Sequence, residues 1–372
     1  MSSAFSRAFI CFVLVAQCAT AEERLQLTLP PLWFGVPNVA VSLYYDNVVL
    51  TQKPESYRFE VKCDIGSSDD RRWTVTPSVK DVGDHAMVVT VKDAKGRVME
   101  EVQTLLRIAP RNAGSGRTLK LLIVGDSLTH ASLYPNEIAR LLNEPDNPKL
   151  TLLGTHKPAP AAPGVVHEGY GGWTWERFLT KWEPTSTNPE ARFRSSPFLF
   201  ADANGKGKLD LARYFKERCN GQTPDVVTFQ LGINDCFGAK VDDSTALEKH
   251  ITGVLDNAEK LITAFRSAAP QAVIAIGLTT PPNARQAAFK ANYKDKYTRW
   301  GWKRIQHRLV QRMLERLGMR EQERIFLVPT ELNLDPIDGY PVNNGVHPSP
   351  AGYAQIGTSY YAWLKNWMTP AK

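Results

Sequence analysis

Apolar and polar positions alternate through the first part of the chain. Val102, Leu106 and Ile108 are separated by polar residues, and this period of two is typical of a strand with one buried face. The segment Asp93–Gly96 lies between two such runs and has the composition of a hairpin turn. Short strands at this spacing predict that residues 24–110 form an all-β sandwich.

Continuous apolar runs replace this alternation from about residue 118 onward. An uninterrupted apolar run is expected of a strand that is buried on both faces in a parallel sheet. Helical patterns fall between these runs, so strands and helices alternate along the chain. The alternation predicts a doubly wound α/β domain over residues 118–372. The predicted strands are Leu119–Val124, Leu150–Leu153, Val226–Leu231, Val273–Ile276 and Ile325–Val328.

Two of the predicted helices have clear start signals. Thr245 with Glu248 forms a capping box at the start of the first, and Ser349-Pro350 combines an N-cap with a first-turn proline in the last. The stretch 183–222 lacks strong periodicity and predicts a loop-rich insertion over the edge of the sheet. The expected buried faces are Leu247, Ile251, Val254, Leu255, Ala258, Leu261, Ile262 and Phe265 in the first helix, and Tyr353, Ile356, Tyr360, Trp363, Leu364 and Trp367 in the last.

Two further segments lie outside the predicted domains. Arg7, the apolar run Ala8–Val15 and the small-residue end Ala19–Ala21 are typical of a signal peptide, so we expect residues 1–21 to be removed and the protein to be exported, either to the periplasm or beyond. The alternative is a buried or membrane-anchoring helix, but the apolar run is shorter than the about 20 residues that span a bilayer. Residues 111–117 have no apolar periodicity and are predicted to be the linker.

Composition and charge narrow the functional classes. The hydrophobic fraction of 43% and the charged fraction of 22% are those of an ordinary globular protein. The three cysteines that follow the signal peptide are expected to be unpaired, and no clustered Cys/His spacing indicates a metal site, so we expect no cofactor. Part of the net charge of +7 lies between residues 290 and 320, as a solvated helix face or a surface that attracts polyanions. No nucleic-acid motif accompanies it, and we expect no nucleic-acid partner.

Four short motifs supply the groups that ester hydrolysis needs, in one order along the chain. Ser127 lies in Gly-Asp-Ser-Leu after the first predicted strand of the α/β domain, and Gly172 ends a Gly-Tyr-Gly-Gly motif. Asn234 lies in Gly-Ile-Asn-Asp just past the third strand, and His347 precedes the last helix. Ligands of open parallel sheets bind beyond the carboxyl ends of the strands, where these residues can converge. Each residue could instead be a cap, a turn or a surface residue, but their joint order favours a site.

With these motifs the chain resembles the SGNH/GDSL hydrolase family over roughly residues 118–368. The resemblance implies a flavodoxin-like α/β/α fold that hydrolyses esters, with Ser127 as the nucleophile. It matches Gly172 to the second block of the family, Asn234 to the third and His347 to the last. The preceding strands resemble the immunoglobulin-like sandwiches that accompany many bacterial enzymes.

The same residues have a physical rationale. A serine hydroxyl is a poor nucleophile until a base takes its proton, and His347 is the only base within the motifs. The backbone N–H groups of Ser127 and Gly172 and the side-chain amide of Asn234 can donate to the oxyanion of a tetrahedral intermediate. The Gly-x-Ser-x-Gly elbow of common α/β-hydrolases and the His-Glu-x-x-His zinc motif do not occur in the sequence.

One position departs from the family's pattern. The family usually has an aspartate three residues before its histidine, where this chain has Asn344. A carboxylate there would hold the tautomer of His347 and stabilise the imidazolium, whereas an amide oxygen accepts the same N–H without a charge. We rank three explanations. An amide or backbone oxygen orients the histidine of a Ser–His dyad, or Asp335 or Asp338 substitutes for the missing acid, or activity is low or lost.

The predicted substrate is an acylated, above all acetylated, carbohydrate, with small esters and lipids left open. The segment Glu168–Thr174 is similar in wording to the carbohydrate acetylesterases of the family. The aromatic residues Trp173, Trp175 and Phe237 lie beside the motifs and suit sugar rings, unless they only pack in the core. An acyltransferase and a non-catalytic carbohydrate-binding protein are the rival functions. The sandwich either binds glycan or braces the catalytic domain, and we expect no membrane span.

Overall fold

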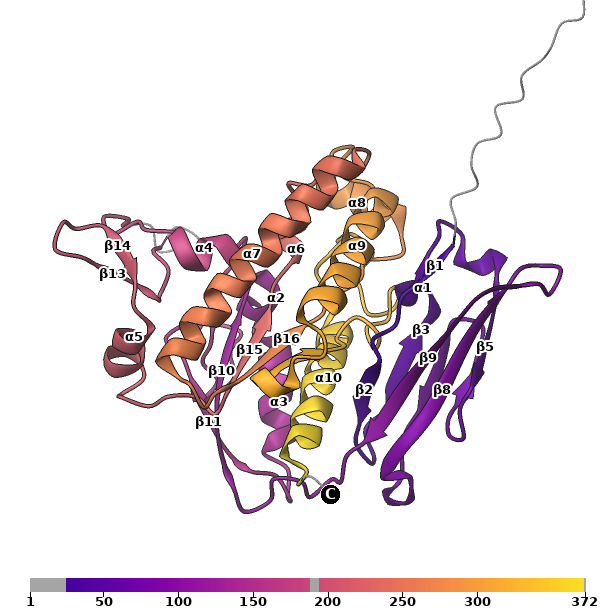
Figure 1. Cartoon of the computed structure of the whole chain (residues 1–372), viewed down its shortest axis with the longest axis horizontal. Helices are drawn as coiled ribbons and strands as arrows, with labels where there is room; N and C mark the ends of the chain where they lie inside the picture. Colours follow the sequence, from indigo (N-terminus) through magenta and orange to yellow (C-terminus); the bar gives the residue numbers. More distant parts are fainter. Residues whose placement is uncertain (1–24, 188–193, 371–372) are drawn as a thin grey trace, which may run out of the picture.

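The computed structural model describes residues 25–187 and 194–370. The predicted signal peptide, residues 1–21, lies outside the described residues. The helices of the described ranges include none with the length and apolar character needed to cross a bilayer. In Figure 1 the N-terminal strands form one body on the right, and the α/β part lies to their left.

The N-terminal part is a β-sandwich, as the alternating pattern predicts. The strands β8 (Gly83–Lys92) and β9 (Val98–Ile108) form a long antiparallel hairpin, and Gly96 N–H donates to the Asp93 carbonyl at 3.0 Å in its predicted turn. One sheet has the order β2-β9-β8-β5 and the other β3-β7-β6. The remaining elements are β1 (Gln26–Leu27), β2 (Leu32–Gly35), β3 (Val41–Tyr44), α1 (Tyr45–Val48), β4 (Val49–Leu50), η1 (Pro54–Ser56), β5 (Arg58–Lys62), β6 (Ser67–Ser68), β7 (Arg72–Val75) and η2 (Val79–Asp81).

The C-terminal part is built on a parallel sheet with the order β11-β10-β15-β16-β17, and a short β12 pairs with the end of β10. Every pairing along this order is parallel. Each predicted apolar run is one of these strands to within one residue at either end, because burial on both faces requires continuous apolar sequence. The bounds are β10 (Thr118–Gly125), β11 (Lys149–Leu153), β12 (Glu168–Gly169), β15 (Val226–Gln230), β16 (Val273–Gly277) and β17 (Ile325–Val328).

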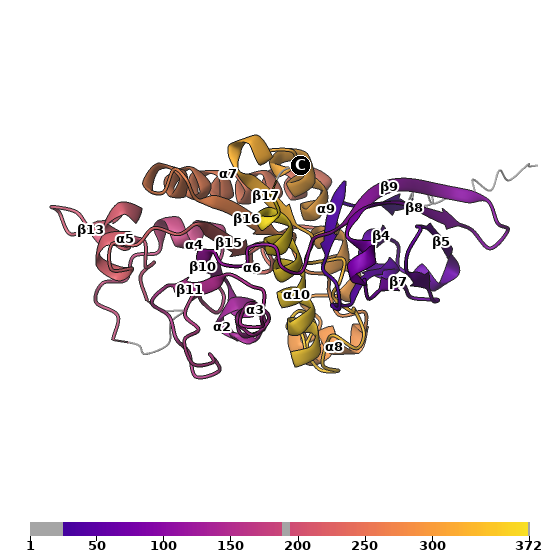
Figure 2. The same cartoon turned by 90° about the horizontal axis from the view of Figure 1, so that it is seen from below.

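Helices cover both faces of this sheet, which confirms the doubly wound α/β fold. Figure 2 shows α7 (Ser244–Ala268) and α9 (Arg299–Leu317) on one side of the strands, with α2 (Ser127–His130), α3 (Leu133–Leu142) and α10 (Pro350–Met368) on the other. The sandwich lies against the end of the three layers where β17 forms the sheet edge.

The start of α7 corrects one prediction, and its partner helix resolves another. All eight apolar positions expected to face the core are buried, but the N-cap is Asp243, not the predicted Thr245 box. The Asp243 carboxylate accepts the Ala246 N–H at 2.9 Å.

Along the helix, carboxylates of α7 pair with arginines of α9, among them Glu248 with Arg308 at 2.5 Å. These pairs balance much of the positive charge of the basic stretch, which favours the helix-face interpretation.

The last helix begins as predicted, but it is buried on more sides than one apolar stripe. Ser349 is its N-cap and Pro350 its first residue. Of the predicted buried face only Trp367 is half-exposed, whereas polar positions such as Thr358 and Lys365 are buried as well. The reason is that α10 packs on α3 and also against β2 of the sandwich. The Lys365 ammonium donates to the Ala113 carbonyl of the proposed linker at 2.5 Å.

The stretch 183–222 is more regular than its sequence predicts. Its described residues include the antiparallel pair β13 (Leu199–Ala201) and β14 (Gly207–Leu209), followed by α5 (Leu211–Arg218). The apolar faces of such short elements are too brief to show a period. Residues 188–193 lie outside the described ranges.

The sandwich is tied to the segment that connects β17 to α10. The Asn47 side-chain amide donates to the carbonyls of Glu331 and Leu334 at 2.8 and 2.7 Å. The Ser42 N–H donates to the Asn333 side chain at 2.8 Å, and Leu332 is fully buried in the core of the sandwich. The sandwich therefore braces a long irregular connection, which carries His347 near its far end.

Candidate active site

Ser127 is the first residue of α2, directly after the turn that leaves β10. The carboxylate of Asp126 caps this helix by accepting the Leu128 N–H at 2.9 Å. Asp126 is buried, and burial raises its pKa well above the ordinary value for an aspartate. The Ser127 side chain stays half-exposed, so the turn presents a hydroxyl at the carboxyl end of a central strand.

The Gly-Tyr-Gly-Gly motif runs beside this turn. Gly169 of β12 is paired with Gly125 of β10, and the Tyr170 N–H donates to the Gly125 carbonyl at 3.1 Å. Gly172 then adopts a φ of +76°, a left-handed conformation that favours glycine. Within the described residues the backbone N–H groups of Ser127 and Gly172 have no protein partner. Both are therefore available to donate to a ligand.

Asn234 lies in α6 (Ile233–Cys236), which follows β15. Its amide donates one N–H to the Trp173 carbonyl at 3.0 Å, and a primary amide has a second N–H to offer. The neighbouring Asp235 carboxyl accepts the Trp175 N–H at 3.4 Å, and burial raises the pKa of Asp235 to about 7. These two contacts join the second motif to the third, and they fix Gly172 and Asn234 relative to each other.

His347 connects the serine to the residue that replaces the expected acid. Its Nε2 lies 2.8 Å from the Ser127 hydroxyl, and its Nδ1 lies 3.1 Å from Oδ1 of Asn344. Because an amide oxygen only accepts, Nδ1 must be the protonated nitrogen, which leaves Nε2 free to accept the serine proton. Burial lowers the pKa of His347, which favours the neutral ring that a general base needs.

The two aspartates that could have substituted for an acid at position 344 face another partner. Asp335 and Asp338 pair with Arg71 of the sandwich at 2.5 and 3.1 Å. In the part of the chain that the structure describes, no carboxylate is hydrogen-bonded to His347. The geometry therefore favours the amide-oriented histidine over the substitute acid.

Asn283 is a site residue that the sequence analysis missed. It is fully buried in the segment after β16, and its side-chain amide donates to the carbonyls of Pro341 and Asn344 at 2.9 and 3.0 Å. Its own N–H donates to the Gly345 carbonyl at 2.9 Å. Asn283 thus holds the two successive carbonyls, of Asn344 and Gly345, that lie between the histidine's acceptor and His347. The feature of the sequence that could have identified Asn283 is its position after the fourth predicted strand, Val273–Ile276.

Phe289 of α8 (Gln286–Tyr293) packs on the same turn. A Cβ added at Gly345 would lie 3.1 Å from three atoms of the Phe289 ring, closer than side chains normally pack. The glycine therefore lets the Asn344–His347 turn rest flat against a fully buried aromatic ring.

The structure corrects two of the predicted substrate contacts. Trp173 is fully buried and Trp175 is 2% exposed, so neither ring presents a face to a sugar. Their backbone groups are instead hydrogen-bonded to the side chains of Asn234 and Asp235, as described above. Phe237 is half-buried, and its ring packs against Trp302 at 4.5 Å between centroids. It remains a predicted substrate contact.

The arrangement can perform acyl transfer through a serine. It combines a hydroxyl, a neutral base with a fixed tautomer and up to three N–H donors at the end of one sheet. A group of three or more His, Cys, Asp or Glu side chains able to hold a metal ion is not found among residues 25–187 and 194–370.

A comparison with protein families agrees with this chemistry. A model of the GDSL-like lipase/acylhydrolase family matches residues 123–355. No curated protein matches the chain. A family 3 carbohydrate esterase from Clostridium thermocellum aligns at 18% identity with a TM-score of 0.41, over 68% of this chain and 98% of its own. One from Talaromyces cellulolyticus gives 17%, 0.41, 68% and 98%. These structural likenesses are too weak to indicate a substrate.

Proposed function

The chain belongs to the GDSL-like lipase/acylhydrolase family and is an esterase, and we propose that it removes acyl groups, above all acetyl groups, from carbohydrate by means of Ser127 and His347. The observation that carries the proposal is the contact of 2.8 Å between the Ser127 hydroxyl and Nε2 of His347. A serine in this position has its base already in place.

The proposed reaction has two halves. Ser127 Oγ attacks the ester carbonyl while His347 Nε2 takes the hydroxyl proton, and the carbonyl oxygen becomes an oxyanion. The N–H groups of Ser127 and Gly172 and the second N–H of the Asn234 amide donate to that oxyanion. The intermediate collapses when the sugar oxygen leaves with the proton from His347. Water then attacks the acyl-serine by the same route and releases the carboxylic acid.

Asn344 is assigned the role of orienting His347 without a charge. Its Oδ1 also accepts the backbone N–H groups of Val346 and His347 at 3.2 and 3.0 Å, so its position is fixed by the turn itself. An amide oxygen keeps the tautomer, but it stabilises the imidazolium less than a carboxylate does. Burial also disfavours the charged imidazolium, and it thereby lowers the pKa of His347.

Three observations support the substrate class and the location. The sequence of Glu168–Thr174 is similar to the corresponding motif of carbohydrate acetylesterases, and a β-sandwich accompanies the catalytic domain. Residues 1–21 have the pattern of a signal peptide. We therefore propose that the enzyme is exported and acts on acetylated glycans outside the cytoplasm.

A fluorophosphonate probe and an acetyl-ester assay test the proposal together. The wild-type protein should be labelled at Ser127 and should hydrolyse p-nitrophenyl acetate and acetylated oligosaccharides. Ser127→Ala should lose labelling and at least about 10⁴-fold in kcat. Ser267→Ala is the matched control, since its hydroxyl only bonds the Thr263 carbonyl on the exposed side of α7. Labelling that survives in Ser127→Ala would exclude the proposed nucleophile.

A further inference from the structure

A cavity of about 380 Å³ lies between the sandwich and the catalytic domain. Sandwich residues, among them Gln52, Phe59 and Arg71, form one wall, and Ala284 and Ile337 belong to the other. Its size falls within the range of about 300–1,000 Å³ that small-molecule sites occupy, and boundaries between domains are frequent places for such sites.

Two sets of ion pairs cross the domain boundary at this cavity and fix its walls. Arg71 of the sandwich reaches Asp335 of the catalytic domain at 2.5 Å. In the opposite direction, Arg299 at the start of α9 reaches Asp46 of α1 at 2.9 Å, with both side chains less than one-fifth exposed. Lys303 contacts the same Asp46 carboxylate. The cavity is therefore a preformed hollow and not a gap between domains that drift apart.

The chemistry of the lining suits a neutral, hydroxyl-rich ring. Phe59 is half-buried, and its ring is held by parallel stacking on Tyr45 at 4.5 Å, as an aromatic floor should be. Exposed polar side chains border this floor and can both donate and accept hydrogen bonds. Both arginines of the lining are already paired with carboxylates, so the cavity has no spare positive charge for an anion. The polar border consists of Gln52, Glu55 and Asp70.

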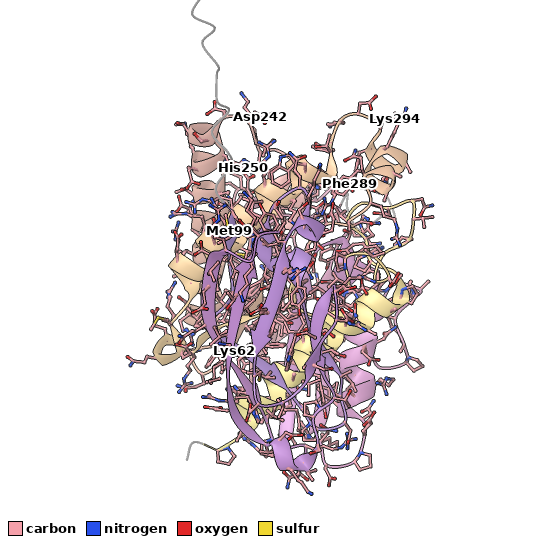
Figure 3. The ribbon with its side chains drawn as sticks, turned by 90° about the vertical axis from the view of Figure 1, so that its right-hand side faces the viewer. Lys62, Met99, Asp242, His250, Phe289 and Lys294 are labelled. Carbon is pink, nitrogen blue, oxygen red and sulfur yellow. The ribbon has the colours of Figure 1, made fainter. Side chains whose placement is uncertain are left out.

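The cavity shares a wall with the segment that carries the histidine. Ala284 follows Asn283, and its N–H donates to the Pro336 carbonyl at 2.7 Å. Both segments leave the carboxyl ends of β16 and β17, the edge of the sheet that also carries Ser127. The cavity is bordered by α1 and by the segment that leads into α8, and α6 carries Asn234. Figure 1 shows all three helices in the upper half of the molecule. In Figure 3, Phe289 and Lys294 lie beyond the upper ends of the sandwich strands.

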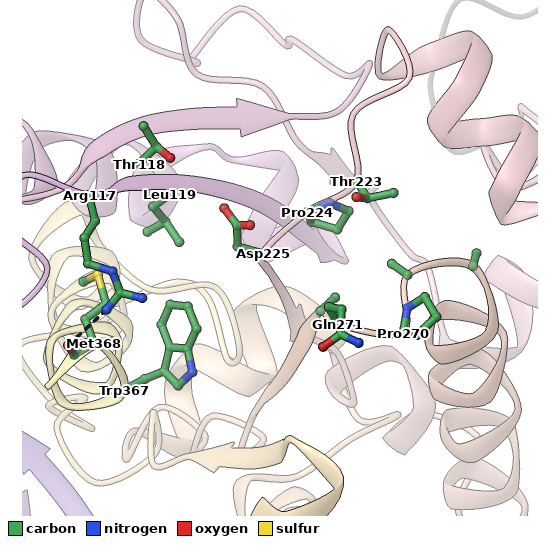
Figure 4. A pocket seen from close by; sticks show the side chains of 13 residues that line it. Arg117, Thr118, Leu119, Thr223, Pro224, Asp225, Pro270, Gln271, Trp367 and Met368 are labelled. Carbon is green, nitrogen blue, oxygen red and sulfur yellow. Dashed lines mark hydrogen bonds between the residues drawn. The ribbon is translucent and has the colours of Figure 1, made fainter. Parts of the chain in front are cut away.

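Another cavity, shown in Figure 4, has a different position. It is lined by Thr118 at the start of β10 and by Asp225 and Ala272, which directly precede β15 and β16. It therefore opens at the amino ends of the strands, on the side of the sheet away from Ser127. A ligand there could not extend along the edge that carries the motifs.

We propose that the interdomain cavity is a subsite for a neutral sugar residue of the same glycan chain whose acetyl group reaches Ser127. This inference rests on the proposed function and makes it more specific, because it assigns an oligosaccharide or polysaccharide as the substrate. Small acetyl esters and acetylated monosaccharides occupy only the catalytic end. The sandwich then contributes directly to substrate binding as well as bracing the histidine segment.

The test compares long and short substrates in a double variant, Gln52→Ala with Phe59→Leu. The substrates are p-nitrophenyl acetate, acetylated glucose, and chemically acetylated xylohexaose and cellohexaose. We expect KM for at least one hexasaccharide to rise roughly tenfold, because the variant loses the flat ring face and one amide. The kcat for that hexasaccharide, and both constants for the two small substrates, should stay the same. Gln103→Ala, an exposed glutamine on β9 outside the cavity, is the matched control and should leave every substrate unchanged.

A binding measurement separates failure of this inference from failure of the proposed function. Calorimetry with unacetylated xylohexaose and cellohexaose on the Ser127→Ala protein should show binding of at least one of them, weakened roughly tenfold by the same double variant. If the wild type hydrolyses none of the esters, the proposed function fails, and calorimetry still decides the cavity. If esters are hydrolysed but the double variant changes neither the hexasaccharide KM nor the binding, the cavity is not a glycan subsite.

Discussion

The serine and the histidine of this site are held in place by different means. Ser127 follows β10 within two residues, and the pairing of β10 with β12 and β15 fixes the turn from both sides. His347 lies nineteen residues after Val328, the last residue of β17, in a connection that contains no strand. Regular secondary structure thus positions the proposed nucleophile, whereas side chains from elsewhere position the proposed base.

Those side chains come from two places. Asn283 holds the turn from within the catalytic domain through the carbonyls of Pro341 and Asn344. Arg71 of the sandwich holds the start of the same connection through Asp335 and Asp338. The difference shows that residues of the sandwich contact the connection that carries the proposed base, whereas the proposed oxyanion donors directly follow strands of the sheet.

The largest effect is expected from the sheet side, at Asn234. Replacement by alanine removes a side-chain donor to the oxyanion and should lower kcat on p-nitrophenyl acetate by about 10²–10³-fold. Fluorophosphonate labelling of Ser127 should remain, only slower, because the nucleophile and its base are unchanged. A kcat within threefold of the wild type would remove Asn234 from the oxyanion hole.

The next effect is expected at Asn283, on the histidine side. Asn283→Ala leaves two partly buried carbonyls without their donors, so we expect the turn to shift and the distance between His347 and Ser127 to change. We expect kcat to fall about 10- to 100-fold with KM nearly unchanged. Steady-state kinetics with a small ester measure both constants.

Asn136→Ala is the control for Asn283. The Asn136 amide holds a different loop by donating to the Pro160 carbonyl at 2.9 Å and accepting the Ala162 N–H at 2.9 Å. Its loss should leave kcat unchanged. Equal losses of kcat in both variants would show general loosening of the fold and not a positioning role of Asn283.

A smaller effect is expected at Arg71, where the sandwich reaches the connection. The side chain is 43% exposed, and pairs of this exposure contribute little in water, so Arg71→Met should lower kcat no more than about fivefold. Added salt should reduce wild-type activity in the same direction by screening the pair. Activity assays at low and high ionic strength measure both effects.

Arg107→Met provides the comparison for Arg71. Arg107 is 39% exposed and pairs with Asp84 inside the sandwich at 2.5 Å, so the same kind of ion pair is lost without any contact to the histidine segment. We expect this variant to keep full activity. If the Arg71 and Arg107 variants behave alike, the sandwich does not assist the base.

The sequence predicted the sheet side of the site well for a physical reason. A strand that is buried on both faces needs an uninterrupted apolar run, so its end is visible in the sequence, and Ser127 and Asn234 lie directly after such ends. The bounds of the five core strands were right to within one residue. The same rule gave the doubly wound fold.

The histidine side was less predictable, because its contacts join residues far apart in the chain. Asn283 meets Asn344 across 61 residues, and Arg71 meets Asp335 across 264. Neither contact leaves a local pattern. Trp173 and Trp175 failed for a related reason, since a position beside a motif does not reveal whether a ring faces the ligand or the core.

In the proposed mechanism an uncharged amide orients His347. The pH dependence of kcat/KM for p-nitrophenyl acetate, measured for the wild type and for Asn344→Asp, tests it most directly. The reaction needs the neutral imidazole, so activity falls as pH drops through the pKa of His347, which burial holds below its ordinary value. A carboxylate at 344 would stabilise the imidazolium and raise that pKa.

We therefore predict that the acid limb of the Asn344→Asp profile lies at higher pH than that of the wild type, by about one unit or more. Asp338→Asn should leave the wild-type limb unchanged, because Asp338 faces Arg71 and is 70% exposed. Orientation of His347 by the amide would be contradicted if Asn344→Asp left the limb where it is, or if Asp338→Asn alone removed most of the activity.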